Sequence, residues 1–219
     1  MLRITRYDLC MFDIQQRIEE LVASNPGQMT VPEYAAIAGE LQMRGPCSLL
    51  VFGLGRDTDL WVDINVQGRT SFLEHDSRFI TLMRTRSEAV SRSFTDPKTR
   101  VDVYEVKYRT VLRSAETYKV VDDAGAAMRV LGMDLPPRVR DHQWDVILVD
   151  APPGDGPERP GRFQSIYEAM RLAAPDACVF FHDIHRPVER WFSTRFLGKS
   201  IEEVGHLGVF GTKAKRPRR

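Results

Sequence analysis

Acidic and histidine side chains follow short apolar runs at three places in this sequence. Glu74 ends the run TSFLE, Asp150 ends WDVILVD, and His182 and Asp183 follow ACVFF. Runs of this length and content are typical of buried strands in a parallel sheet. Ligands of such sheets bind beyond the carboxyl ends of the strands, where carboxylates and imidazoles can bind them or move a proton. We therefore expect these four side chains to meet at one rim of a sheet.

A glycine turn follows another apolar run, LLVF. Gly53 and Gly55 form a G-x-G pattern there, and glycine permits positive φ and close approach of backbone N–H groups to a ligand. Glu74 lies 19 residues after Gly55, at a position where an acid can accept hydrogen bonds from both ribose hydroxyls. Thr58 replaces the third glycine of the dinucleotide fingerprint, so a pyrophosphate motif is not satisfied. The pattern predicts an adenosine-type ligand, against the alternative of an ordinary tight turn with a surface Glu. The residues expected to bind it are Gly53, Gly55, Asp57 and Glu74.

Strands that alternate with helices must position these groups. The patterns predict strands over 49–52, 70–74, 101–109, 144–150, 177–181, 201–204 and 207–210, and helices over 11–23, 30–41, 58–65, 76–91, 115–131, 163–172 and 188–196. This alternation implies an α/β, Rossmann-like fold, with a mainly parallel doubly wound sheet and helices on both faces. We expect residues 1–44 to form helices that pack on the core or cover it as a lid, 45–212 to form the main domain, and 213–219 to be a basic tail.

Composition restricts the function classes. The chain has 219 residues, a formal net charge of +1 and 42% apolar residues, which fits one globular domain without a strong attraction for nucleic acid or membranes. Its three cysteines, Cys10, Cys47 and Cys178, lack metal or redox spacing and are expected to be reduced. Neither a secretory signal nor a long apolar segment is visible, so we expect a cytoplasmic protein. The oligomeric state stays open.

Charge is unevenly distributed along the chain. Between Arg78 and Arg113, nine Lys and Arg residues accompany four acids, and the last seven residues are mostly basic. The simpler interpretation is a solvated face and a frayed end. The alternative is attraction of an anionic substrate or polymer.

Several unusual strings resemble one known family. They are PCSLLVFGLGRD (46–57), GRTSFLEHD (68–76), VKYRT (106–110), LPPRV (135–139), WDVILVDAPPG (144–154), ERPGR (158–162), IYEA (166–169) and FFHDIHRPVERWFSTRFL (180–197). In this order they resemble the plant glucuronoxylan 4-O-methyltransferases and the related irregular-xylem proteins of xylan biosynthesis. The resemblance covers roughly residues 45–197 and implies a class I methyltransferase fold that uses S-adenosylmethionine (SAM). The plant proteins carry an N-terminal Golgi anchor that is not seen here, and Val51 and Phe52 stand where broader methyltransferases have an acid.

The resemblance implies transfer of a methyl group to a hydroxyl, the 4-OH, of glucuronic acid in a glycan or glycoside. Methyl transfer is an in-line displacement that requires positioning and a base for the hydroxyl proton. His182 or Asp183 is expected to be that base, with Asp150 binding the hydroxyl or, together with Asp183, a divalent metal ion. Arg162, His185 and Arg186 match the family strings and are expected to bind the acceptor, since a guanidinium can clamp its carboxylate.

Two other interpretations remain open. The first keeps the cofactor but transfers the methyl group to another small-molecule hydroxyl, such as a phenol. The second is a non-catalytic ligand-binding protein of the same fold, which the three costly polar groups at one rim disfavour. A dinucleotide oxidoreductase is disfavoured by Thr58.

Overall fold

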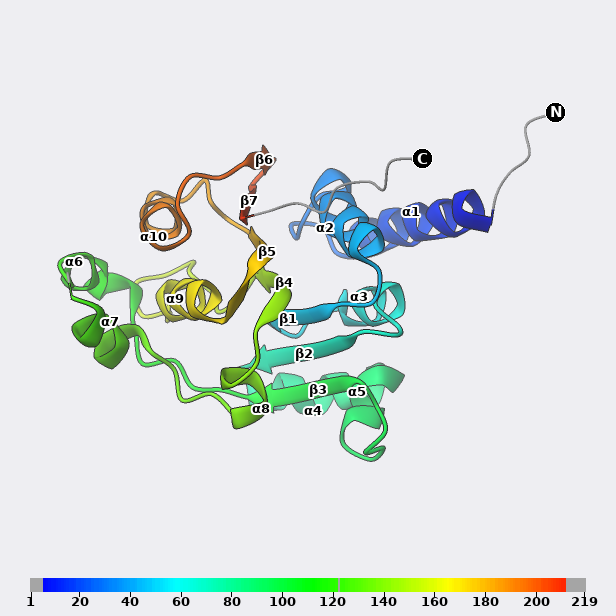
Figure 1. The fold of residues 1–219 in the computed structure, drawn as a ribbon, viewed down its shortest axis with the longest axis horizontal. Helices are drawn as coiled ribbons and strands as arrows, with labels where there is room; N and C mark the ends of the chain where they lie inside the picture. The colour runs from blue at the N-terminus through cyan, green and yellow to red at the C-terminus, as the bar shows by residue number, and fades with distance from the viewer. Residues whose placement is uncertain (1–5, 122, 212–219) are drawn as a thin grey trace.

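A central sheet organises the molecule. The computed structural model describes residues 6–121 and 123–211, with only the backbone described for 6–12. Within these residues seven strands form one sheet in the order β3-β2-β1-β4-β5-β7-β6 (Figure 1). Strands β1 to β5 pair in parallel, whereas β7 pairs antiparallel with β5 and β6. The strands are β1 (Ser48–Phe52), β2 (Arg69–Glu74), β3 (Val101–Glu105), β4 (Trp144–Val149), β5 (Ala173–Phe181), β6 (Glu202–Val204) and β7 (Leu207–Gly211).

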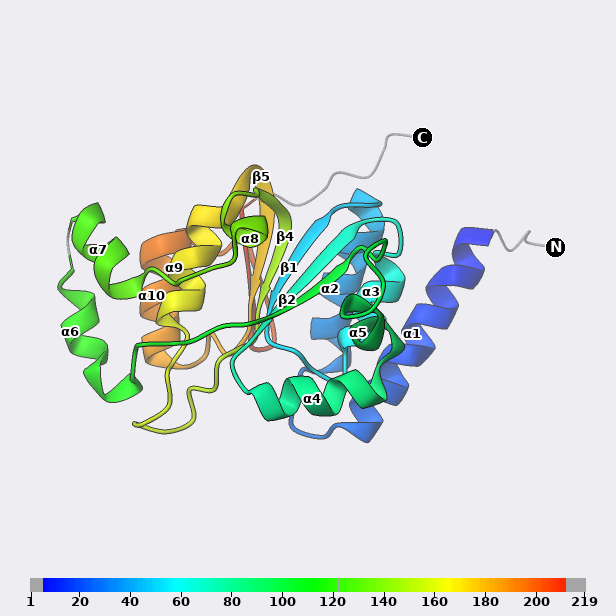
Figure 2. The same cartoon turned by 90° about the horizontal axis from the view of Figure 1, so that it is seen from below.

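Helices cover both faces of this sheet. Figure 2 shows α1 to α5 on one side and α6, α7, α9 and α10 on the other. The first group is α1 (Arg6–Ser24), α2 (Val31–Arg44), α3 (Thr58–Ile64), α4 (Ser77–Arg86) and α5 (Glu88–Ser93). The second is α6 (Ala115–Lys119), α7 (Ala124–Leu131), α9 (Phe163–Leu172) and α10 (Pro187–Leu197), and the short α8 (Pro137–Arg140) precedes β4. The predicted doubly wound fold is confirmed.

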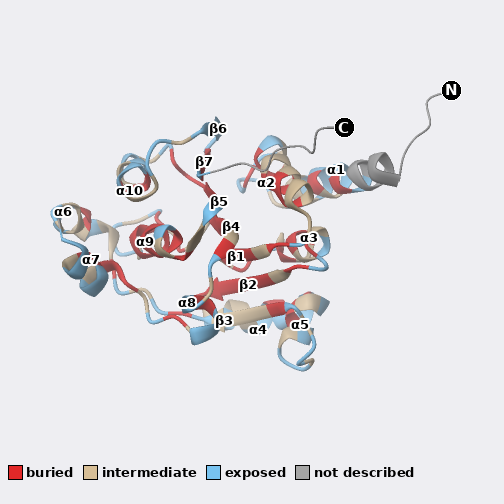
Figure 3. Cartoon of the chain, in the orientation of Figure 1, coloured by how far each residue is buried: buried red, intermediate tan, exposed pale blue. Residues whose placement is uncertain are grey.

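Alternation along the central strands builds two apolar cores. Leu49 and Val51 of β1 belong to the core under α1 to α5, and Leu50 and Phe52 belong to the core on the opposite face. Successive side chains of a strand point to opposite faces, so a strand that is apolar throughout must be covered on both. Figure 3 shows the result as buried strands between helices whose outer faces are exposed.

Some predicted boundaries differ from the structure. The helix expected over 76–91 is interrupted at Ser87, whose extended backbone lets its side chain cap α5 by accepting the Val90 N–H at 3.1 Å. The strand expected over 101–109 ends at Glu105 because its partner β2 ends at Glu74. Cys47 and Cys178 are buried, and neither forms a disulfide among the described residues, whereas the side chain of Cys10 and the basic tail 213–219 lie outside what the structure describes.

Candidate functional site

A cavity of about 840 Å³ opens at the carboxyl ends of β1, β2, β4 and β5. The turn between α1 and α2, residues 24–28, also lines it. We call the part at β1 and β2 the cofactor half and the part at β4 and β5 the acceptor half. The predicted residues Gly53, Gly55, Asp57 and Glu74 line the cofactor half, and Asp150, Arg162, His182, Asp183 and Arg186 line the acceptor half.

The glycine turn leaves β1 in a conformation that excludes side chains. Gly53 has φ of 120°, and a Cβ there would lie 3.1 Å from the Cβ of Ala151 in the loop after β4. A Cβ on Gly55 would collide with the carboxylate of Asp57. Both glycines are therefore required for the backbone to pass this close to the cavity.

Glu74 is a buried carboxylate that backbone N–H groups hold in place. Its Oε2 accepts the Leu54 N–H at 3.1 Å, and its Oε1 accepts those of His75 and Asp76 at 2.7 and 2.8 Å. Burial alone would raise the pKa of Glu74, but these hydrogen bonds and the His75 ring keep that pKa below its ordinary value. Glu74 is therefore an ionised acceptor at the cavity wall.

Asp57 contrasts with Glu74 in its partners. Its Oδ2 accepts the Trp61 Nε1–H at 2.8 Å, and no Lys, Arg or His of the described residues forms an ion pair with it. Burial, followed by the nearby charge of Asp150, raises the pKa of Asp57 to about 6. This carboxylate is thus ionised at neutral pH without a compensating cation.

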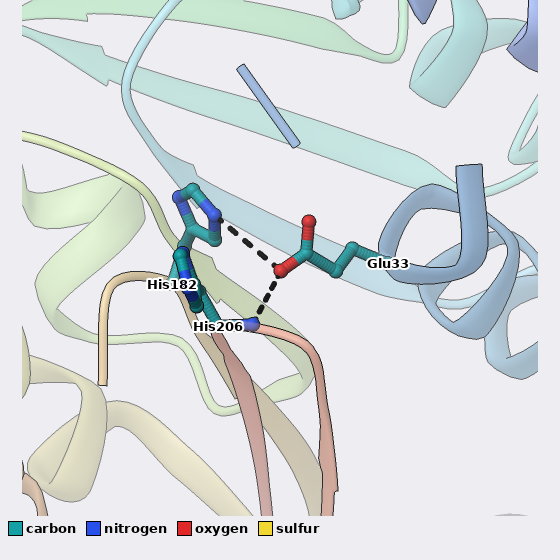
Figure 4. Close-up of side chains that lie close together, drawn as sticks. All are labelled: Glu33, His182 and His206. Carbon is teal, nitrogen blue, oxygen red and sulfur yellow. Dashed lines mark hydrogen bonds and ion pairs between the residues drawn. The ribbon is translucent and has the colours of Figure 1, made fainter. Parts of the chain in front are cut away.

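The acceptor half is centred on a histidine between two carboxylates. Nδ1 of His182 lies 2.9 Å from Oδ1 of Asp150. Nε2 of the same ring lies 3.7 Å from Oε1 of Glu33 on α2 (Figure 4). Burial opposes the charged imidazole, but the hydrogen bond to Asp150 and the nearby Asp183 raise the pKa of His182 above its ordinary value. The same hydrogen bond and the Arg162 charge overcome burial and lower the pKa of Asp150. Because 3.7 Å is too long for a hydrogen bond, Nε2 can still exchange a proton.

Arg162 holds this half together from a buried position. Its guanidinium contacts Asp183 at 2.9 Å and Asp150 at 3.3 Å, and it donates to the His182 carbonyl oxygen at 2.6 Å. Asp183 has φ of 67°, a left-handed conformation that Asp adopts more readily than most residues. That turn aims its carboxylate at Arg162 and at Arg186, 3.1 Å away. With these contacts made, Arg162 organises the other side chains rather than standing free for a ligand.

Arg186 and His185 differ in their relation to the cavity. Arg186 lines it, and its side chain is 30% exposed. His185 lies outside the lining and stacks on His206, with ring centroids 3.8 Å apart. Desolvation and the neighbouring His206 lower the pKa of His185, which keeps its ring neutral at physiological pH.

Ligand atoms suitable for a metal ion also occur at this rim. One atom each from Asp150, His182 and Asp183 lie within 4.8 Å of one another, and the same holds for Glu33, His182 and His206. The Arg162 guanidinium already contacts both carboxylates of the first group.

Two site residues were missed from the sequence. Glu33 was interpreted only as part of a helix start, and it does form a capping box with Thr30. Its Oε1 also accepts the His206 N–H at 2.6 Å, which ties α2 to the turn between β6 and β7. Tyr34, the next residue, lines the cavity and lies against Trp61 with ring centroids 5.8 Å apart. The S/T-x-x-E signal locates a helix start, but nothing in the sequence indicates the contact across the fold.

Comparison with known proteins identifies relatives over most of the chain. The family described as IRX15/IRX15L/GXM matches residues 32–210. Glucuronoxylan 4-O-methyltransferase 2 of Arabidopsis thaliana is 37% identical over 86% of this chain and 67% of its own length. Arabinogalactan O-methyltransferase 2 of the same plant is 32% identical over 94% of this chain and 75% of its own length. The chain spans about two thirds of the glucuronoxylan relatives.

A solved structure agrees on the fold. A 16S rRNA N2 methyltransferase from T. thermophilus, determined in complex with AdoMet and guanosine, superimposes with a TM-score of 0.50. The alignment covers 87% of this chain and 45% of that chain at 13% identity. At this identity the likeness concerns the fold alone, which is that of Rossmann-like methyltransferases.

The comparisons also correct one expectation. The proteins of the matched family are Golgi-lumenal proteins of xylan biosynthesis, so the cytoplasmic location expected from the sequence is wrong. Among the described residues, no helix combines the length and the apolar character needed to span a membrane. The match over residues 32–210 and the identities above 30% lead to one conclusion: this chain belongs to the IRX15/IRX15L/GXM family.

Proposed function

We propose that this protein is a SAM-dependent O-methyltransferase that methylates a hydroxyl, the 4-OH, of glucuronic acid in a glycan or glycoside. One observation carries the proposal. A single cavity joins an adenosine-compatible glycine turn and Glu74 to the paired His182 and Asp150, in a member of a family whose relatives are named glucuronoxylan 4-O-methyltransferases.

The cofactor half fits the adenosine end of SAM. The turn at Gly53 and Gly55 keeps a backbone path that side chains would fill, and the ionised Glu74 is an acceptor for ribose hydroxyls. When bound, SAM supplies an electrophilic methyl group. The chain's own contribution is to hold the acceptor oxygen in line with that group and to remove its proton.

His182 is the proposed base for that proton. The Nδ1–H group donated to Asp150 fixes the tautomer, so Nε2 carries the lone pair that takes the hydroxyl proton. Carboxylates on both sides, Asp150 and Glu33, stabilise the imidazolium that forms. Asp183 is engaged by two guanidinium groups, which supports His182 over Asp183 in this role.

Arg186 is the proposed partner of the uronate carboxylate. Its guanidinium is partly exposed at the cavity, whereas that of Arg162 is buried against Asp150 and Asp183. A guanidinium fork binds a carboxylate through two parallel hydrogen bonds. Arg162 then acts by holding both aspartates, and His185 supports the acceptor half from outside the cavity lining.

A divalent cation at Asp150, His182 and Asp183 is a second way to activate the hydroxyl. Such an ion would share its ligands with the Arg162 guanidinium, which already contacts both aspartates. The two routes differ in their response to a chelator.

The test begins with calorimetric titration of purified protein with SAM and with NAD. Methyl transfer is then measured with glucuronate-bearing oligosaccharides and with the same oligosaccharides after reduction of the carboxylate to an alcohol, each with and without chelator. SAM binding with transfer only to the glucuronate series supports the proposal. Loss of transfer with chelator assigns the activation to a metal ion, and absence of SAM binding rejects the methyltransferase function.

A separate assay is needed to identify the polysaccharide that carries the glucuronate. One relative named for arabinogalactan is 32% identical to this chain, about as similar as one of those named for glucuronoxylan, at 33%. Fragments of both polysaccharides that end in glucuronate should therefore be assayed side by side. The fragment that is methylated with the higher kcat/KM identifies the class of polysaccharide that this protein prefers as acceptor.

A further inference from the structure

Asp57 carries a negative charge that the described residues leave without a cation. It precedes α3 and lines the cavity, and its carboxylate accepts a hydrogen bond from the neutral indole of Trp61. Asp57 is partly buried, and an ionised carboxylate with reduced access to water is costly unless it is paired. In the acceptor half, by contrast, Asp150 and Asp183 both contact Arg162.

The surroundings of Asp57 increase this cost. Asp150 is close enough to raise the pKa of Asp57, and both acids raise the pKa of Tyr34, which lines the same cavity from α2. The charge of Asp57, with that of Asp150 nearby, thus gives this corner a negative potential, while the raised pKa of Tyr34 keeps its phenol neutral. A bound cation would relieve the repulsion, so the corner favours a positively charged ligand group.

Strand order tells which part of a ligand reaches this corner. Strand β1 lies between β2, which ends at Glu74, and β4, which precedes Asp150. A nucleoside whose ribose binds Glu74 and whose 5′ substituent points toward the acceptor half must pass the end of β1. There it meets the glycine turn and then Asp57.

We propose that Asp57 binds the α-ammonium group of the methionine portion of SAM, with Asp150 adding long-range attraction. The inference rests on the proposed function, because SAM is a nucleoside with a cationic amino-acid arm. The pairing gives Asp57 its missing cation and anchors the arm.

Calorimetry with three ligands tests this assignment. S-Adenosylhomocysteine carries the ammonium but no sulfonium charge, its deaminated analogue has hydrogen in place of the ammonium, and 5′-methylthioadenosine lacks the whole arm. Wild-type protein should bind the deaminated analogue about 10- to 100-fold more weakly than S-adenosylhomocysteine. This measurement needs no variant and so does not depend on the folding of one.

Variants then locate the ammonium site. Asp57→Asn should weaken S-adenosylhomocysteine binding about 10- to 100-fold and leave the affinity for 5′-methylthioadenosine within a factor of about 2. Glu74→Gln is the matched control, because loss of a ribose contact should weaken both ligands equally. An equal loss for both ligands in Asp57→Asn would show that Asp57 only shapes the turn, and no loss for either would place the ammonium elsewhere. Failure of the wild-type protein to bind any of the three would instead reject the cofactor itself.

Discussion

The two halves of the cavity handle buried charge in opposite ways. In the acceptor half, Asp150 and Asp183 are paired with Arg162, and His182 is bonded to Asp150. In the cofactor half, Glu74 is held by backbone N–H groups and by the His75 ring, whereas Asp57 has no cationic partner among the described residues. The charged side chains of the acceptor half are therefore paired with one another without a ligand. In the cofactor half, the carboxylate of Asp57 needs a cationic group of the ligand as its partner.

The difference follows from what each half is proposed to bind. SAM is cationic, so a site with excess negative charge attracts it. A glucuronate acceptor is anionic, so its site needs a cation at the surface and a base that is kept in position. The predictions below use this contrast, from the largest expected effect to the smallest.

The largest effect should come from removing the base in the acceptor half. Asn at position 182 keeps a donor for Asp150 but cannot take the hydroxyl proton. We expect His182→Asn to lower kcat by about 10²- to 10⁴-fold, with the affinity for S-adenosylhomocysteine unchanged. Steady-state kinetics and calorimetry measure the two quantities. A kcat within a factor of about 3 of wild type would exclude His182 as the base.

The same base sets the direction of the pH dependence. His182 must be neutral to accept a proton, and Asp150 raises its pKa above the ordinary value. The kcat/KM should therefore rise with pH through an apparent pKa above that of a free histidine. In Asp150→Asn this acid limb should move to lower pH, because the charge that stabilises the imidazolium is gone. If the acid limb of the Asp150→Asn profile stays at the same pH, the titration of His182 does not cause that limb.

The next effect concerns stability rather than rate. Arg162→Met leaves the half-buried Asp150 and the buried Asp183 without their shared cation, and we expect a loss of about 3 to 5 kcal/mol in the free energy of unfolding. Arg113→Met is the control, because Arg113 and its partner Glu158 are 60% and 68% exposed. It should cost less than about 1 kcal/mol in urea unfolding. Similar losses in the two variants would mean that the acceptor half is not preassembled by Arg162.

Arg186 should affect specificity more than stability. We expect Arg186→Gln to lower kcat/KM about 10- to 100-fold for a glucuronate acceptor and to change it little for the matching glucose acceptor. Arg190→Gln in α10, the helix that follows Arg186, is the control, since Arg190 pairs with Glu203 and does not line the cavity. If Arg186→Gln slows both acceptors equally, the guanidinium does not recognise the carboxylate.

How far the sequence predicts the site also differs between the halves. The cofactor half depends on the glycine turn and on Glu74, which follow apolar runs that periodicity identifies. The acceptor half depends on contacts between distant segments. Strand-end position predicted that Asp150 and His182 would meet, but nothing local indicated that Glu33, on α2, would approach His182. Arg162 was predicted at the rim, yet its burial depends on the final packing of α9 and cannot be read from the sequence.

Helix boundaries show the same limit. The sequence predicts one helix over residues 76–91. In the structure Ser87 caps α5 and also donates to Asp59 of α3, a contact between elements that competes with helix continuation. The fold class needed only the alternation of strands and helices, whereas the breaks depend on such tertiary partners.

The smallest effect is a change in the free energy of unfolding, and its sign should differ between an aspartate of the cofactor half and an aspartate of the acceptor half. The pKa of Asp57 is raised to about 6, so its ionisation destabilises the ligand-free protein. This penalty is absent below the unfolded-state pKa, near 4, and is fully present above about 6. Asp57→Asn should therefore raise the free energy of unfolding by about 1 to 3 kcal/mol at pH 8 and change it little at pH 4.

Asp150→Asn should do the reverse. The pKa of Asp150 is lowered, so its ionised form stabilises the fold above the unfolded-state pKa, and the variant should lose stability at pH 8. Urea unfolding of both variants at the two pH values measures the contrast. If Asp57→Asn is also destabilising at pH 8, the Asp57 carboxylate already has a partner in the ligand-free protein, and it does not need the cationic group of the ligand for this purpose. A gain in stability together with weaker S-adenosylhomocysteine binding would mean that Asp57 is kept at a cost to folding because the ligand requires its charge.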